Sequence, residues 1–375
     1  MFYLSAMRAI VLGLFVLLHL TTTAQEHANT RLAVDIDAMG GVILRHSSKF
    51  ITDVGGYTQQ YEAGIRIRTF GQAAWQRKAR YPELGVALHH AQFANHAVFG
   101  DAWALLPHIR FTFARTRWVN VWLRTGAGLA WITRPYDRRT NPTNNIIGSK
   151  LNAIIQIRPG LSIHLTDRID LTTAFSFTHY SNSRSQSPNL GINVAAATVG
   201  LSVDAGRAEH TANTDPIPPP AKRNEYIVRF SMAVNDQQPG GPKTPVYLTT
   251  VGYARYTSVI NKVMVGTTVA YDQGERDFLE YTVPEQLDDA GRRALDWSVF
   301  VADEIMLGDL GLNFLVGVYL MDRTLNVEPI YAKVGANYYL PAFGRADDRR
   351  FFVGVNLKSH YSVAQFLEFG MGVAL

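Results

Sequence analysis

Residues 169–177 read Ile-Asp-Leu-Thr-Thr-Ala-Phe-Ser-Phe, so that apolar side chains alternate with polar or small ones. Successive side chains of an extended chain point to opposite faces, and Ile169, Leu171, Phe175 and Phe177 therefore share one face. The other face is polar or small. This stretch predicts a β-strand that is apolar on one side only.

The same period of two recurs along most of the chain, while runs with the period of a helix are almost absent. It is clear in 199–204, in 351–358 and in 369–375, where Phe, Met, Val and Leu alternate with Gly, Gly and Ala. By this rule the sequence contains about sixteen candidate strands, with twelve or fourteen as alternatives. Many are about ten residues long, which is the length of a strand that crosses a membrane.

The apolar face of such strands points either into a soluble core or outward to lipid, and the period alone does not separate the two. Strand length favours lipid, and so do aromatic residues near the predicted strand ends. These residues are placed as an interfacial girdle and are Trp118, Trp131, Tyr226, Tyr338 and Tyr339. We therefore predict an all-β fold, a transmembrane antiparallel β-barrel of the outer membrane.

The N-terminus indicates export. Arg8 precedes the apolar run 9–20, and a short polar stretch then ends at Ala24. A positive residue, an apolar run too short for a comfortable membrane span and a small residue before the cut define a secretory signal peptide. We expect residues 1–24 to be removed by cleavage after Ala24, and the mature protein to reach the cell outer membrane.

Composition excludes several classes of function. The 375 residues include no cysteine, so disulfide frameworks and cysteine-based zinc or thiol chemistry are excluded. The 47% of hydrophobic residues exclude a disordered chain, and the net charge of +5 is mild and spread out. Histidines such as His89, His90 and His108 lack metal-ligand spacing, and no phosphate loop or nucleic-acid signature is present. We expect neither a metal nor a cofactor, and no nucleic-acid partner.

Connections between the predicted strands are of two kinds. Tight ones, such as 116–117 and 308–309, alternate with long polar ones such as 135–149. We expect residues 25–375 to form a single barrel with its tight turns in the periplasm. The Pro-rich segment 205–224 is then a periplasmic loop of that barrel; the alternative is a linker between two smaller barrels.

One segment carries residues with chemistry. Residues 177–193 read Phe-Thr-His-Tyr-Ser-Asn-Ser-Arg-Ser-Gln-Ser-Pro-Asn-Leu-Gly-Ile-Asn. The phase of the preceding strand puts His179 and Ser181 on the apolar, lipid-facing side, and the phase of 199–203 puts Asn193 there too. Polar side chains facing lipid are costly, and a lipid substrate that enters sideways would explain them. Alternatively, they have left the membrane and belong to a polar loop.

This segment resembles the lipid A 3-O-deacylase family of outer-membrane acyl hydrolases. The matching residues stand at the family's spacing and are His179, Ser181, Asn182, Pro188 and Asn189. The stretches 81–85 and 141–152 look like further family features. The resemblance covers roughly residues 30–205, and residues 225–375 look like the additional strands of longer relatives.

The resemblance implies an ester hydrolase that removes an ester-linked acyl chain from lipid A, the lipid part of lipopolysaccharide, at the outer leaflet. Ser181 would be the nucleophile and His179 the general base, with Asn182 and Asn189 near the oxyanion. The family's third residue is a Glu, where this sequence has Asn193. A carboxylate orients the imidazole and stabilises its charged form, whereas an amide only orients it.

A second His-Tyr-Ser begins at His360, but His360 has the phase of Asn356 and Lys358, which predicts a lumen position. Glu368 also falls on the lumen face and is a poor substitute for the missing acid. The alternative to an esterase is a non-catalytic outer-membrane channel or a binding or structural barrel. A filled lumen would favour the esterase, and a conducting lumen the channel. The oligomeric state is left open.

Overall fold

The computed structural model describes residues 32–205, 211–220, 223–236, 241–282, 287–321, 328–340, 350–361 and 363–375. The signal peptide expected at 1–24, with its cleavage after Ala24, lies outside these residues.

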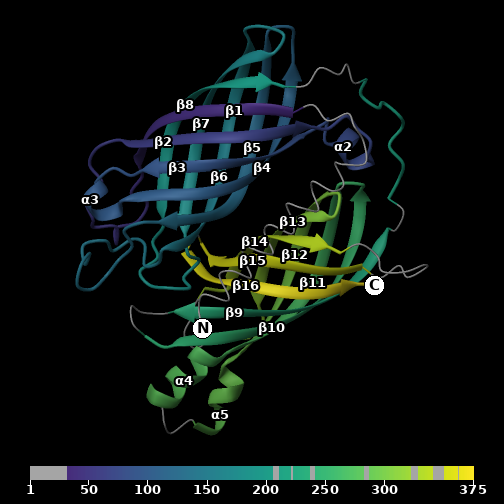
Figure 1. Cartoon of the computed structure of the whole chain (residues 1–375). Coiled ribbons are helices and arrows are strands. Elements are labelled where there is room, and N and C mark those ends of the chain that lie inside the picture. The colour runs from purple at the N-terminus through teal and green to yellow at the C-terminus, as the bar shows by residue number, and fades with distance from the viewer. Residues whose placement is uncertain are drawn as a thin grey trace.

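The first eight strands form one closed antiparallel barrel (Figure 1). They are β1 (Leu32–Ile43), β2 (Thr58–Arg68), β3 (Glu83–Gln92), β4 (Asp101–Arg115), β5 (Val119–Ile132), β6 (Leu151–His164), β7 (Ile169–Ser181) and β8 (Ile192–Asp204). Closure comes from the pairing of β1 with β8, in which Ile36 lies opposite Leu201.

The next eight strands form a second closed antiparallel barrel. They are β9 (Asn224–Asp236), β10 (Lys243–Ser258), β11 (Asn261–Asp272), β12 (Leu295–Leu307), β13 (Leu310–Tyr319), β14 (Ile330–Tyr339), β15 (Arg350–His360) and β16 (Val363–Ala374). Here β16 pairs with β9, and Phe369 lies opposite Met232.

The count of sixteen strands is therefore confirmed, but the single barrel expected over 25–375 is wrong. The Pro-rich segment after β8 is the linker of the alternative interpretation, and it separates two barrels that each close on themselves. Alternation shows which way each side chain points but not which strands pair at closure. The first barrel and the second correspond to the regions 30–205 and 225–375 that the sequence separated.

Both barrels turn their apolar side chains outward. Ile36, Phe175 and Leu201 are 64%, 55% and 47% exposed, while their strand neighbours point into the lumen. Exposed apolar bands of this kind are stable in lipid, where the hydrogen bonds of a closed sheet leave no backbone group unpaired. The prediction of a transmembrane antiparallel barrel fold is confirmed.

The aromatic girdle was predicted with one error. Trp118, Trp131 and Tyr226 are exposed on the outer surface, as expected for interfacial residues. Tyr339 is instead 1% exposed inside the second barrel, and its hydroxyl lies 2.6 Å from Lys262 Nζ. Next to Tyr338 it necessarily faces the other way, because adjacent strand residues point to opposite faces.

Most short turns lie at one end of the barrels and most long connections at the other. The turns after β4 and β6 are closed by the hydroxyls of Thr116 and Thr166, which accept hydrogen bonds from backbone N–H groups at 2.9 to 3.3 Å. The tight turns after β4, β6, β10 and β12 follow even-numbered strands, as a barrel with its N-terminus in the periplasm requires. Some connections depart from this rule: the one between β15 and β16 is short, and the one between β2 and β3 is long and carries a helix.

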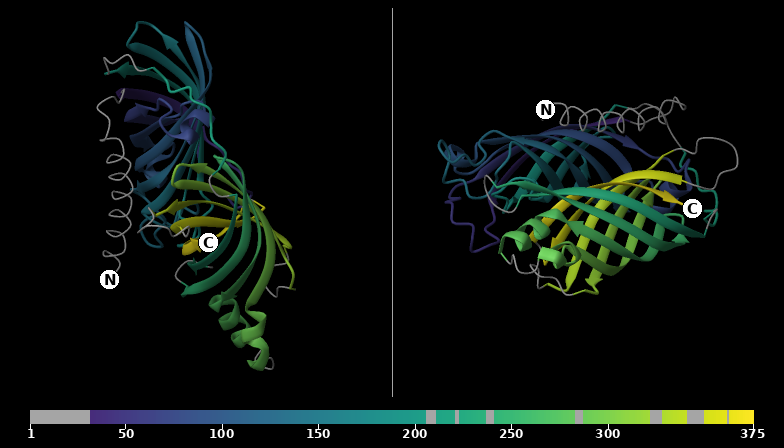
Figure 2. Two further views of the ribbon diagram at one scale, coloured as in Figure 1. Left: turned by 90° about the vertical axis from the view of Figure 1, so that its right-hand side faces the viewer. Right: turned by 90° about the horizontal axis from the view of Figure 1, so that it is seen from below.

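The longer connections carry short helices, of which α4 and α5 project from one end of the second barrel (Figures 1 and 2). The helices are α2 (Ala74–Lys78), α3 (His96–Phe99), α4 (Gln273–Thr282) and α5 (Leu287–Arg293). None of the helices in the described ranges is long and apolar enough to span a membrane.

Candidate active site

The β7–β8 hairpin brings His179 and Asn193 together. The two residues are direct cross-strand partners, and His179 Nδ1 lies 2.5 Å from Asn193 Oδ1. Both have the phase of Phe175 and Phe177, so they face outward rather than into the lumen. The predicted juxtaposition of these two residues on one face is present in the structure.

A residue that the sequence analysis missed extends this pair. Asn193 Nδ2 lies 3.0 Å from Nδ1 of His46, and His46 Nε2 lies 2.8 Å from the carbonyl oxygen of Leu190. His46 belongs to the connection between β1 and β2. It reaches Asn193 only because β1 closes the barrel against β8. No local motif marks it in the sequence.

The three side chains determine one another's protonation. Both ring nitrogens of His46 lie near a carbonyl oxygen, Nε2 at 2.8 Å from Leu190 and Nδ1 at 3.4 Å from Leu44. The shorter contact assigns the proton of a neutral His46 to Nε2, so that Nδ1 accepts the N–H of the Asn193 amide. Asn193 Oδ1 then accepts the proton on His179 Nδ1. This tautomer leaves Nε2 of a neutral His179 with a free lone pair, which is what a general base needs.

Ser181 is the last residue of β7 and lies two positions beyond His179 on the same face. At about 3.3 Å per residue, the two residues are roughly 6.6 Å apart along the strand, a span that their side chains can bridge. Ser181 is 5% exposed, so its hydroxyl is sheltered from solvent. In the described part of the chain no hydrogen bond joins this hydroxyl to His179, so the structure places the two residues on one strand face without a direct contact.

The site loop, residues 182–191, is held by Asn182 and Asn189. The N–H of Asn182 donates to Asn189 Oδ1 at 3.0 Å. The side-chain nitrogen of Asn182 donates to Ser149 Oγ and to the Gln186 carbonyl, both at 2.8 Å. Both amide hydrogens of Asn182 are thus engaged in shaping the loop and in joining it to the β5–β6 connection.

Gly191 allows the loop to pass close to the imidazole. Its φ is +82°, a backbone conformation that favours glycine. A Cβ at this position would lie 2.7 Å from Cε1 of His179. The absence of a side chain at Gly191 therefore sets the space in which the imidazole is oriented.

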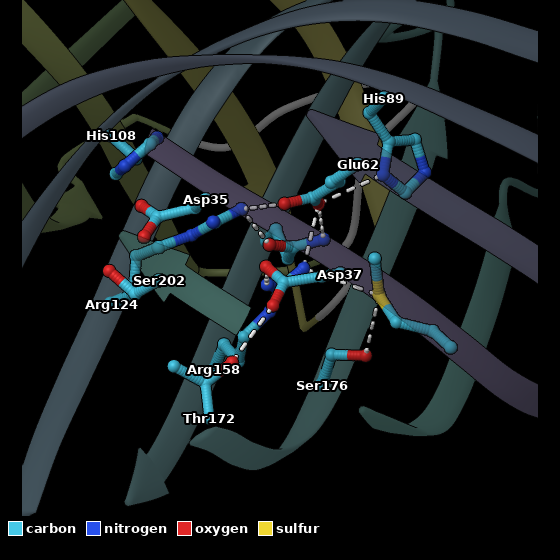
Figure 3. Close-up of polar contacts among 12 residues, drawn as sticks. Asp35, Asp37, Glu62, His89, His108, Arg124, Arg158, Thr172, Ser176 and Ser202 are labelled. Atoms are coloured by element: carbon cyan, nitrogen blue, oxygen red, sulfur yellow. Dashed lines mark hydrogen bonds and ion pairs between the residues drawn. The ribbon is translucent and has the colours of Figure 1, made fainter. Parts of the chain in front are cut away.

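On the lumen side, β7 is anchored by Tyr180, which is fully buried. Its hydroxyl lies 2.7 Å from His89 Nε2, and His89 Nδ1 lies 2.9 Å from Glu62 Oε1. Figure 3 shows His89 and Glu62 pointing toward one another among the other lumen residues. Tyr180 lies between His179 and Ser181, so this chain of contacts holds the strand that carries them.

Charged side chains fill the lumen of the first barrel. Glu62 pairs with Arg124 and with Arg158, whose NH2 lies 2.7 Å away, and Arg158 also pairs with Asp37 at 2.8 Å (Figure 3). All of these side chains are at most 7% exposed. A lumen occupied by paired, desolvated charges does not offer a water-filled path, and it argues against a channel.

The second barrel is filled in the same way, and its His-Tyr-Ser triplet is not a duplicate site. His360 points into the lumen, where its Nε2 lies 3.1 Å from the Tyr319 hydroxyl. Glu368 pairs with Lys333 at 2.7 Å and is 2% exposed. Both lumen predictions are confirmed. In the described part of the chain, no group of three or more His, Asp or Glu side chains is arranged to hold a metal ion.

Fold and site together define a class: two filled transmembrane barrels, one of which carries a serine, a histidine and an asparagine on its outer face. Residues 59–202 match the family model described as lipid A 3-O-deacylase (PagL). Residues 224–375 match the model described as the C-terminal domain of acyloxyacyl hydrolase. The first barrel thus matches the lipid A 3-O-deacylase family, which is a family of ester hydrolases, and the second barrel matches the C-terminal domain of acyloxyacyl hydrolase.

Three solved structures are similar to parts of the chain. The outer membrane enzyme PagL has 18% identity and a TM-score of 0.31, over 44% of this chain and 97% of that one. Neisserial surface protein A has 11% identity and a TM-score of 0.31, over 46% of this chain and 96% of that one. The Pseudomonas putida toluene transporter TodX has 8% identity and a TM-score of 0.17, over 93% of this chain and 88% of that one. These low scores add nothing to the family match. No curated protein matches the chain.

Proposed function

We propose that this protein is an outer-membrane esterase that removes an ester-linked acyl chain from lipid A, with Ser181 as nucleophile and His179 as general base. The observation that carries the proposal is the hydrogen-bonded pair of His179 and Asn193 on the lipid-facing side of β7 and β8, with Ser181 two residues further along the same face of β7. The family match supports the reaction class, and the geometry of the β7–β8 hairpin supports the choice of residues.

The chemistry follows the logic of a serine esterase. Ser181 Oγ attacks the ester carbonyl carbon while His179 Nε2 takes the hydroxyl proton. The tetrahedral intermediate collapses, the bond to the lipid A oxygen breaks, and His179 returns the proton to that oxygen. Water then attacks the acyl-enzyme with the same histidine as base, which releases the fatty acid and restores Ser181.

Asn193 takes the place that a carboxylate has in the family. Its amide oxygen fixes the imidazole by the contact at 2.5 Å. An amide that is free to rotate could also present its nitrogen to the imidazole and impose the wrong tautomer. A neutral His46 with its proton on Nε2 opposes this rotation, because its Nδ1 can accept the amide N–H but cannot donate to the amide oxygen, which therefore stays toward His179.

For the oxyanion we propose Asn189 as a side-chain donor. Its amide oxygen is occupied by the Asn182 N–H, which leaves the Asn189 nitrogen to donate. Asn182, whose own amide hydrogens are engaged with Ser149 and Gln186, contributes by shaping the loop. Donors fixed in advance by such a network stabilise developing negative charge without reorganisation.

The substrate reaches the site from the membrane. With β1 starting in the periplasm, β7 runs outward and ends on the extracellular side, where lipid A forms the outer leaflet. Outward-facing Phe175 and Phe177 extend the surface below His179 into the apolar band. An acyl chain lying along this band would present its ester at the level of Ser181.

Mass spectrometry of lipid A tests the proposal. Lipid A is extracted from Gram-negative cells without an endogenous deacylase that express the wild type, Ser181→Ala or His360→Ala. We expect the wild type and His360→Ala to shift lipid A by the mass of one acyl chain, and Ser181→Ala to leave it unchanged. Unmodified lipid A in cells whose wild-type barrels are folded in the outer membrane would favour a binding or structural barrel.

A further inference from the structure

Asp236, at the end of β9, joins the second barrel to the site loop. Its carboxylate Oδ2 accepts the N–H of Ser187 at 3.1 Å, and its carbonyl oxygen accepts the Ser187 hydroxyl at 3.0 Å. The N–H of Asp236 donates to the carbonyl of Arg184 at 3.2 Å. Three hydrogen bonds thus join β9 to the loop that follows Ser181.

The environment of Asp236 is unusual for a residue that serves only its own barrel. It is 2% exposed, and its Oδ1 is buried without a hydrogen-bond partner among the described residues. A buried carboxylate is costly unless it is hydrogen-bonded. Its side-chain hydrogen bond goes to the other barrel, so the contact with the loop is what this aspartate provides.

The loop needs external support at this point. Ser183 and Arg184 both have left-handed backbone conformations, with φ of +54° and +63°, which residues other than glycine rarely adopt. Asp236 bonds to Arg184 on one side of the loop and to Ser187 on the other. Between them Gln186 accepts the Asn182 amide, so the clamp acts directly on the network around Asn182 and Asn189.

The opposite ends of the barrels are also held near one another. The first barrel binds the linker there, because the hydroxyl of Tyr81, near the start of β3, donates to the carbonyl of Asn213 at 3.0 Å. A Cβ at Gly308, in the turn after β12, would lie 3.1 Å from Nε1 of Trp75 in α2. Contacts at both ends keep the outer end of β9 beside the outer end of β7.

We propose that Asp236 is a positioning residue and that the second barrel holds the site loop of the first in its working conformation. Asp236 touches neither His179 nor Ser181, and it acts through Ser187 and Arg184 on the loop. The effect on catalysis rests on the proposed function, whereas the contact itself does not.

The contact is tested independently of activity by a disulfide. The chain contains no cysteine, so the full-length double variant Ser187→Cys with Asp236→Cys has a single possible intramolecular pair. After cleavage in the linker between the barrels, the two halves should run together on a non-reducing gel and separately after reduction. The control pairs Ser187→Cys with Asp309→Cys, in the turn between β12 and β13 at the other end, and should not cross-link. A cross-link in the control alone, or in neither, would overturn the contact.

The positioning role is tested by steady-state deacylation of lipid A in detergent. We expect Asp236→Ala to lower kcat about tenfold with little change in KM, since misplaced groups cost rate more than binding. Asp236→Asn should stay within about twofold of the wild type, because its amide oxygen still accepts the Ser187 N–H. Asp309→Asn, which weakens an exposed ion pair with Arg350 at the opposite end of the second barrel, is the control and should leave kcat and KM unchanged.

The outcomes separate the two proposals. If the double cysteine variant cross-links but Asp236→Ala keeps full activity, the positioning role is contradicted. If the double cysteine variant cross-links but the folded wild type does not deacylate lipid A, the esterase proposal is contradicted and the contact between the barrels still stands. Equal losses in Asp236→Ala and Asp309→Asn show that the second barrel acts by general stability, which also overturns the positioning role.

Discussion

His46 Nδ1 and the amide nitrogen of Asn193 lie 3.0 Å apart, although 147 positions separate the two residues in the chain. The contact exists because β1 closes the first barrel against β8. It decides which end of the amide faces His179. In the proposed mechanism, Asn193 can orient the imidazole in place of an acid because His46 keeps the amide from turning.

Removing His46 should therefore impair catalysis without unfolding the barrel. His46 is exposed in a connecting loop, so His46→Ala loses little packing. We expect its deacylation rate to fall about fivefold to tenfold, the equivalent of one hydrogen bond. Initial rates are measured at equal folded fraction, determined by the heat-dependent gel shift of the barrel. His96→Ala, in the β3–β4 connection, is the control; an equal fall there would remove His46 from the site.

Asn193 can be tested in two directions. Asn193→Ala removes the contact with the imidazole and should lower the rate while the barrel remains folded. Asn193→Asp should retain or raise activity, since a carboxylate both orients and stabilises an imidazolium. Against this gain stands the cost of a partly desolvated carboxylate. An alanine variant as fast as the wild type would show that another group holds His179.

Gly191 offers a steric test of the imidazole position. Gly191→Ala introduces a Cβ 2.7 Å from the imidazole carbon and strains a backbone with φ of +82°. We expect at least a tenfold loss of rate, about 1.4 kcal/mol, from displacement of His179. Gly40→Ala in β1 is the matched control, because a Cβ added there would meet nothing within 4 Å. Comparable losses in both variants would point to strand stability rather than to the imidazole.

The nucleophile and the base should be far more sensitive than the second His-Tyr-Ser. Ser181→Ala and His179→Ala each should lower kcat by about a thousandfold or more, as for residues that act as one unit. His360→Ala, inside the second barrel, should leave kcat unchanged, because its partner is the Tyr319 hydroxyl. Rates are compared in one detergent. A loss in His360→Ala like that in His179→Ala would contradict the separation of the two barrels' roles.

Stability of the first barrel should depend on Glu62. Glu62→Ala leaves Arg124 and Arg158 buried without this partner, and we expect a loss of about 3–5 kcal/mol in the free energy of unfolding. Arg276→Ala breaks an exposed ion pair with Glu280 on α4 and should change the free energy of unfolding by less than about 0.5 kcal/mol. Urea unfolding in lipid vesicles measures both. Similar effects in the two variants would show that the lumen charges are not structurally coupled.

Local chemistry in the sequence was enough to predict the strands and the place of the candidate site. Alternation predicted that His179, Ser181 and Asn193 share the outward face and that His360 and Glu368 face the lumen. These inferences succeed because the side chains of a strand alternate strictly, and a hairpin of known phase brings its two ends together.

Only the tertiary structure decided which strands close the sheet, and with them the number of barrels. The pairing of β1 with β8 and of β16 with β9 joins residues far apart in the chain, and no local period contains that information. The same closure brings His46 to Asn193, and the docking of the barrels brings Asp236 to Ser187. The sequence by itself determined which face each side chain occupies, whereas long-range hydrogen bonding between strands determined its neighbours.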